Sequence, residues 1–107
     1  MNLNELGQLV YACEQEIKTA KEKISSSVFE YATSVFKDGQ RVIYRCENYY
    51  LNGKEYEIVL RRPTDCKVTT NSLWGTMLYV SCLPVKKNGE VAKIGLQFFP
   101  IEYLEPK

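Results

Sequence analysis

The chain has 107 residues, of which 45% are hydrophobic and 25% charged, and its 14 basic and 13 acidic residues give a net charge of +1. This composition is typical of one soluble globular domain over residues 1–107, and the near-neutral charge excludes the strong electrostatic footprint of a dedicated nucleic-acid-binding protein. No stretch approaches the run of roughly 18 apolar residues that a membrane span needs, and the start lacks the basic region of a signal peptide, so we expect a cytoplasmic protein with no membrane contact and with free thiols.

The first predicted element is an amphipathic helix over about residues 4–24, with Asn2 or Asn4 as its N-cap. Apolar residues recur in steps of three and four, which keeps them on one face of a helix. They are Leu6, Val10, Cys13, Ile17, Ala20 and Ile24. This spacing is heptad-like and permits a dimer, but the stripe includes Cys13 and Ala20 and lacks a clear charged flank. We therefore expect it to pack on the molecule's own sheet, in a monomer or a weak homodimer.

Two interpretations remain open for residues 25–37. The three serines at 25–27 disfavour a helix interior, because serine competes for backbone hydrogen bonds. The apolar pattern nevertheless resumes at Val28, and the Asp-Gly pair at 38–39 is typical of a helix stop. Either one kinked helix continues to about residue 37, or a second short helix follows the serines, which gives a helical segment over residues 1–38.

Residues 39–107 form the predicted β segment. Alternating apolar residues at 41–47 and 55–61 flank one Asn-Gly pair at 52–53, and those at 77–85 and 93–98 flank another at 88–89. Asn-Gly is typical of a tight type I′ hairpin turn, in which the glycine has positive φ. The link at 62–73 has room for a short fifth strand around Val68. The sequence therefore predicts an α+β fold: one or two helices, then a curved antiparallel sheet of four to five strands.

The strand expected at 77–85 is apolar on both faces, which predicts a central position covered on both sides. Residues 99–104, Phe-Pro-Ile-Glu-Tyr-Leu, resemble the end of an SH3-type barrel, where a strand runs into a 3₁₀ turn. The resemblance covers about residues 40–104 and implies an SH3-like barrel in which Trp74, Pro100 and Tyr103 line a peptide groove. The competing topology is a helix wrapped by a four-stranded open sheet, as in cystatin-like proteins.

The residues for ordinary enzyme chemistry are missing. The chain has no histidine, which removes the commonest general base and metal ligand. The four cysteines are far apart, unlike the close pairs of zinc sites, and no glycine-rich phosphate loop occurs. Cys66, expected in a loop near Lys67, Arg61 and Arg62, is the single candidate nucleophile. We predict no enzyme activity, no catalytic residue, no metal and no cofactor.

The predicted function is a non-catalytic protein-binding module: an adaptor, an accessory subunit, or an inhibitor of another protein, including one encoded by a phage or mobile element. Aromatic residues and arginine dominate binding hot spots. The predicted partner-binding residues are Trp74, Tyr103, Pro100, Arg61, Arg62, Tyr49 and Tyr50. The alternative is a small-barrel nucleic-acid-binding protein. It rests on four arginines that interleave with Tyr49 and Tyr50, since stacking of bases on aromatic rings beside a basic groove holds single strands. The arginines are Arg41, Arg45, Arg61 and Arg62.

Overall fold

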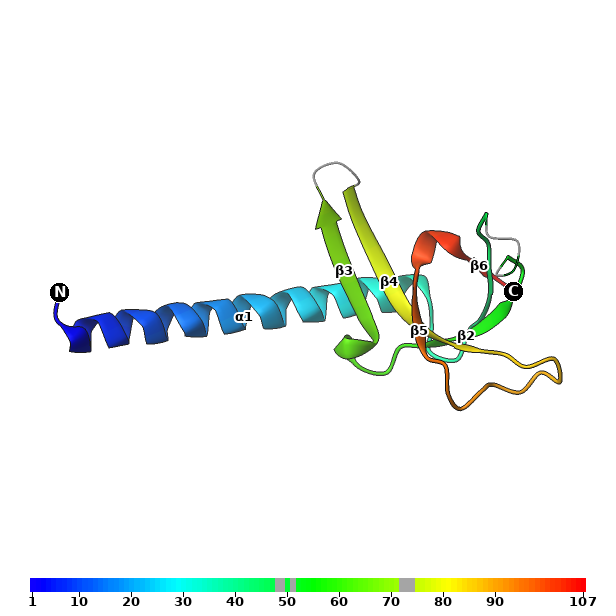
Figure 1. The fold of residues 1–107 in the computed structure, drawn as a ribbon, viewed down its shortest axis with the longest axis horizontal. Coiled ribbons are helices and arrows are strands. Elements are labelled where there is room, and N and C mark those ends of the chain that lie inside the picture. Colours follow the sequence, from blue (N-terminus) through cyan, green and yellow to red (C-terminus); the bar gives the residue numbers. More distant parts are fainter. Residues whose placement is uncertain (48–49, 51, 72–74) are drawn as a thin grey trace.

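The computed structural model describes residues 1–47, 50, 52–71 and 75–107 (Figure 1). One long helix, α1 (Leu3–Val35), precedes an antiparallel sheet. The described residues form six strands: β1 (Arg41–Tyr44), β2 (Glu55–Val59), β3 (Cys66–Asn71), β4 (Gly75–Pro84), β5 (Gln97–Pro100) and β6 (Leu104–Pro106). Two 3₁₀ turns are η1 (Pro63–Asp65) and η2 (Ile101–Tyr103). The predicted α+β class is confirmed, with six strands in place of four to five.

The strand order is β3-β4-β2-β1-β6, and β5 also pairs with β4. The central position predicted for residues 77–85 is confirmed, because β4 pairs with β2, β3 and β5. The 3₁₀ turn expected within residues 99–104 is η2, which joins β5 to β6. The pairing of the described strands does not close into a barrel, and the resemblance to SH3 domains stays a prediction.

Helix α1 is a single element that runs through the three serines. Its N-cap is Asn2, whose Oδ1 accepts a hydrogen bond from the Glu5 N–H at 2.8 Å. Within the serines, the Ser26 hydroxyl donates to the Glu22 carbonyl at 2.7 Å, which satisfies this side chain without ending the helix. The helix ends at Val35, and of the two interpretations left open for residues 25–37 the single helix is correct.

The helix extends far beyond the sheet, with the N-terminus at the tip of a rod (Figure 1). Its 33 residues span about 50 Å at a rise of about 1.5 Å per residue. The radius of gyration is 18.7 Å, whereas a compact domain of this length would have about 13 Å. Every side chain from residue 3 to 27 is exposed. The expectation that the apolar stripe packs on the molecule's own sheet is therefore wrong over most of the helix.

The hydrophobic core lies between the last turns of α1 and the sheet. From the helix, Ala32 is fully buried and Val28 and Phe29 are partly buried, and Phe36 follows directly after the helix end. The strands and their links contribute the other buried apolar side chains: Val42, Tyr56, Ile58, Leu60, Cys66, Leu78, Val80, Cys82, Phe99 and Leu104. We call residues 36–107 with this core the head of the molecule.

The turn at residues 86–90 is a three-residue hairpin loop and not the predicted two-residue type I′ turn. Gly89 has the expected positive φ, at 87°, but no described non-glycine residue has one, so Asn88 does not adopt the type I′ conformation. Lys86 lies opposite two residues of the other strand, Gly89 and Glu90. The Lys86 N–H donates a hydrogen bond to the Glu90 carbonyl at 2.7 Å, and the Lys86 carbonyl accepts one from the Gly89 N–H at 2.9 Å. This is a bulge that has glycine at its left-handed position.

The other Asn-Gly pair ends a longer loop in the same way. Gly53 has a φ of 85°. Tyr44 opposes Gly53 and Lys54 together, with hydrogen bonds of 2.7 and 2.9 Å. The positive φ expected at both glycines is confirmed, and the turn type is wrong at both.

We expect Gly89→Ala to lower the free energy of unfolding by about 1–2 kcal/mol, because alanine is strained at positive φ. A Cβ at this position would meet no atom within 4 Å, so the backbone conformation alone causes the loss. Lys87→Ala is the matched control: Lys87 lies in the same turn and is exposed, but it has no positive φ, so alanine should change the stability by no more than about 0.5 kcal/mol. Urea titration followed by circular dichroism measures both, and equal stability of the Gly89 variant and the wild type would contradict the bulge.

Candidate functional site

The predicted partner-binding residues do not form one patch among the described residues. Trp74 and Tyr49 lie outside the described residues. Tyr50 is exposed in the loop between β1 and β2. Pro100 ends β5, and Tyr103 ends the adjoining η2, so these two residues do lie in neighbouring elements.

Arg61 and Arg62 lie apart from Tyr103. Arg61 Nε is 3.3 Å from the Oδ2 atom of Asp38, which follows the end of α1 and precedes β1. Tyr103 lies at the other end of β1, where its carbonyl accepts a hydrogen bond from the Arg45 N–H at 2.7 Å. The two arginines and the C-terminal turn are therefore separated by the length of β1.

Three of the four arginines considered for nucleic-acid binding lie beside carboxylates. The pairs are Arg41–Glu55 at 3.7 Å, Arg45–Glu105 at 2.8 Å and Arg61–Asp38 at 3.3 Å. Each neighbouring carboxylate offsets the positive charge that would attract a phosphate, and affinity for nucleic acid depends on such charges. The arrangement gives the nucleic-acid alternative no support from geometry.

Tyrosines gather with Phe99 at the edge of the core. The Phe99 ring centroid lies 4.5 Å from that of Tyr44 and 4.8 Å from that of Tyr56. The Tyr103 ring stands edge-on to Tyr44 at 6.2 Å and remains 42% exposed. Burial raises the pKa of Tyr44 and of Tyr56, so both phenols stay protonated well above neutral pH. Two of the eight tyrosines of the chain, Tyr44 and Tyr56, therefore belong to the core or pack against it.

Cys66 is not the loop cysteine that the sequence suggested, because it begins β3 and is buried. Burial, and to a lesser degree the neighbouring Asp65 carboxylate, raises the pKa of the Cys66 thiol. Burial raises the pKa of Cys82 to about 12. Both thiols stay protonated near neutral pH, and a protonated thiol is a poor nucleophile.

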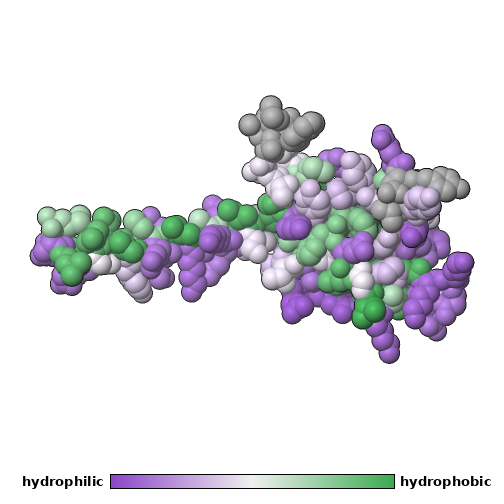
Figure 2. Space-filling view, viewed as in Figure 1, coloured by the Kyte–Doolittle hydropathy of each residue, from purple (hydrophilic) through white to green (hydrophobic). Residues whose placement is uncertain are grey.

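The most extended exposed apolar surface of the described residues runs along α1. We call it the α1 stripe: Leu3, Leu6, Val10, Cys13, Ile17, Ala20, Ile24 and Tyr31. Ile17 is 53% exposed and Ile24 is 57% exposed, although both are large and apolar. Figure 2 shows hydrophobic residues along one edge of the helix and hydrophilic residues along the other. The opposite face carries Gln8, Gln15 and Glu22.

The head contacts a side of α1 that adjoins the stripe. The helix contacts the core through Val28, Phe29 and Ala32. Tyr31, which lies among these residues in sequence, is 58% exposed and belongs to the stripe. Since residues one position apart on a helix are turned by about 100°, Tyr31 stays exposed beside the buried Ala32, and the stripe borders the head only along its edge, at the groove that Ile24 and Val28 line with β3.

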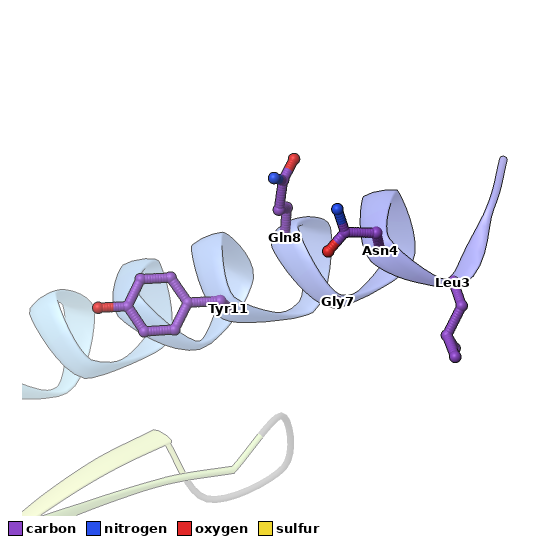
Figure 3. Close-up of a pocket in the computed structure, with 5 residues that line it drawn as sticks. All are labelled: Leu3, Asn4, Gly7, Gln8 and Tyr11. Atoms are coloured by element: carbon purple, nitrogen blue, oxygen red, sulfur yellow. The ribbon is translucent and has the colours of Figure 1, made fainter.

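Near the stripe, the described surface has shallow hollows and no deep pocket. The one at the N-terminal end is formed by α1 alone, and its lining side chains Leu3, Gln8 and Tyr11 point in different directions (Figure 3). Among the described residues, no group of three or more cysteines and carboxylates could hold a metal ion. No helix among them has a segment long and apolar enough to cross a membrane.

Comparison with protein-family models, with curated proteins and with solved structures found no match to this chain.

Proposed function

We propose that this protein is a non-catalytic protein-binding module and that the α1 stripe is its binding surface. One observation carries the proposal: the stripe is exposed over residues 3–31, while the adjoining side of the same helix contacts the head. The function inferred from the sequence is retained, and its binding surface moves from the aromatic residues of the head to the helix.

The energetics of helices support a partner on the stripe. Most helical stability in proteins comes from packing an apolar face, and helices without such packing are marginal in water. Every side chain over residues 3–27 is exposed, and this part of the helix borders the head near Ile24, across the groove to β3. Contiguous exposed apolar surface marks interaction sites. The spacing of the stripe, with its steps of three and four residues, is that of a helix that pairs with another helix.

The test compares three forms of the immobilised chain as bait in extracts of the source cell: wild type, Ile17→Asp and Gln15→Asp. Ile17 lies mid-stripe, and Gln15 lies on the opposite, polar face. A carboxylate buried at a helix–helix contact weakens the contact strongly, and we expect Ile17→Asp to lower the affinity for the bound protein at least about 100-fold. Gln15→Asp adds the same charge outside the contact and should bind as the wild type does.

Circular dichroism and thermal unfolding check that both variants keep the fold of the head. Quantitative mass spectrometry then identifies any protein retained by wild type and Gln15→Asp but lost with Ile17→Asp. Equal capture of the same proteins by all three forms would place binding elsewhere, and the prediction for Trp74, Pro100 and Tyr103 would then be the one to pursue.

A further inference from the structure

We infer that the partner of the α1 stripe is the α1 stripe of a second copy of this chain, with the two helices antiparallel. The inference rests on the function proposed above and names its partner. Three features of the stripe carry it: the sizes of its side chains, the charges on its flanks, and the position of Gly7.

Large and small side chains alternate along the stripe. One set of positions, seven residues apart, carries Leu3, Val10, Ile17, Ile24 and Tyr31. The intervening set begins with the large Leu6, and its other members are small: Cys13, Ala20 and Ser27. In a parallel pair each position meets its own copy, so layers of two isoleucines would alternate with layers of two alanines or two serines. Such small layers leave gaps, and gaps in a core are destabilising.

An antiparallel pair removes the mismatch in all layers but the one of Leu6 and Tyr31, because reversing one helix brings the large set opposite the small set. With Ile17 opposite Ala20 of the second copy, Val10 falls opposite Ser27 and Ile24 opposite Cys13. Each of these layers then combines one large and one small side chain, which is the arrangement that lets facing side chains interdigitate. The large set remains exposed as far as Tyr31, so the head does not occupy this face.

Charges do flank the stripe, which corrects the interpretation of the sequence given above, and they favour the same register. Glu14 and Lys21 lie on one flank, and Glu16 and Lys23 on the other. In this antiparallel register Glu14 faces Lys21 of the second copy and Glu16 faces Lys23, which gives four attractive pairs by symmetry. A parallel pair gives two, between Glu16 and Lys21. Flanking charges of this kind set the orientation and the partner of paired helices.

Neighbouring antiparallel registers are opposed by the same charges. If one helix is shifted by seven residues along the other, Glu14 of one chain faces Glu14 of the second chain, and Glu16 faces Glu16. A shift in the other direction does the same with Lys21 and Lys23. Like charges that face each other across two helices are destabilising, so one register is selected from the three.

The position of Gly7 fits this register. Val28, where α1 begins to contact the head, would face Gly7 of the second copy. A groove between α1 and β3 opens at this point, lined by Ile24, Val28, Cys66 and Val68 among others. A glycine costs a helix interior roughly 1 kcal/mol relative to alanine, and here it leaves room for the second helix to pass beside the head. In this register the smallest residue of the helix lies beside the head.

Oxidative cross-linking of the full chain tests the orientation. In the antiparallel dimer the two native Cys13 residues are about 16 Å apart along the helices, beyond the reach of a disulfide. We expect no Cys13–Cys13 cross-link in the wild type. Ile24→Cys places a thiol opposite Cys13 of the second copy, and mild oxidation should give a covalent dimer with a 13–24 linkage, identified by peptide mass spectrometry. The double variant Ile24→Cys, Cys13→Ser should lose it.

Sedimentation measures whether a dimer exists. We expect the wild type to sediment at twice 12.4 kDa at micromolar concentration and Ile17→Asp to sediment as a folded monomer. A Cys13–Cys13 linkage in the wild type, or a 24–24 linkage in the double variant, would show parallel helices and overturn the inference. A monomeric wild type that still captures another protein through Ile17 would overturn the second copy as partner but leave the proposed function intact. Unchanged behaviour of Ile17→Asp in both sedimentation and capture would reject the proposed function itself.

Discussion

Phe99→Ala is expected to lower the free energy of unfolding by about 3–5 kcal/mol, the cost of removing a buried phenyl ring. Phe99 is 7% exposed, and in the sheet it lies opposite Val80 on the central strand β4. Its ring contacts the rings of Tyr44 and Tyr56, with centroids 4.5 and 4.8 Å away. The lost ring would leave a cavity between three strands. Since small domains are stable by only about 5–15 kcal/mol, a large share of the stability would disappear.

The neighbouring residue provides the control. Phe98 points to the other face of β5, is 37% exposed, and lies under Lys67, whose Nζ atom is 4.7 Å from the ring centroid. Phe98→Ala should cost about 1 kcal/mol or less, because little buried area and one exposed cation–π contact are lost. Chemical denaturation monitored by circular dichroism compares the two, and similar losses in both variants would mean that Phe99 is not the centre of the core.

Ala32→Asp is expected to cost about 3–5 kcal/mol, because the carboxylate would be buried without a partner. Ala32 is fully buried and is the point at which α1 meets the core. The side chain can escape to water only if the helix separates from the sheet, so we expect the head to lose its cooperative unfolding transition or to unfold at much lower denaturant concentration.

Thr33→Asp serves as the matched control, since Thr33 is the next residue along and is exposed. It places the same carboxylate in the last turn of the helix, where the helix dipole opposes it by no more than about 1 kcal/mol. Equal midpoints of denaturation for the two variants would contradict the contact between α1 and the core.

The sequence was sufficient to predict the class of the fold and its central strand. Alternation of apolar residues at 41–47 and 55–61 marked the β1–β2 hairpin, and the two apolar faces of residues 77–85 marked β4 as central. Patterns of period two are local and strong. The assignment was weaker at 93–98, because Ile94 and Leu96 are apolar but exposed, and β5 begins only at Gln97.

The turn type could not be read from Asn-Gly alone. The dipeptide predicts positive φ at glycine, which holds at Gly53 and Gly89. Whether the asparagine also takes positive φ depends on the register of the two strands, which is set by side chains that lie in the core and not in the turn. In both hairpins the register places one extra residue on one strand, and the glycine occupies the bulge.

The partner of the α1 stripe was predicted wrongly, although the stripe itself was found. Its spacing is equally suited to a sheet and to another helix. The length of the helix, which the sequence left open, decides between them. A helix of 33 residues is about 50 Å long, whereas a strand of ten residues, the longest in the sheet, spans about 33 Å. A sheet of this size cannot cover the whole stripe.

Because α1 contacts the head only at its C-terminal end, a small change in its angle there displaces its N-terminal end by a larger distance. The head contacts the last turns of the helix, around Val28, Ala32 and Phe36. Residues 3–27 extend about 37 Å beyond this contact. A rotation of the helix axis by about 10° at this contact would displace Leu3 by about 6 Å, given the helical rise. A small change in the packing around Ala32 would thus be amplified at the far end of the helix.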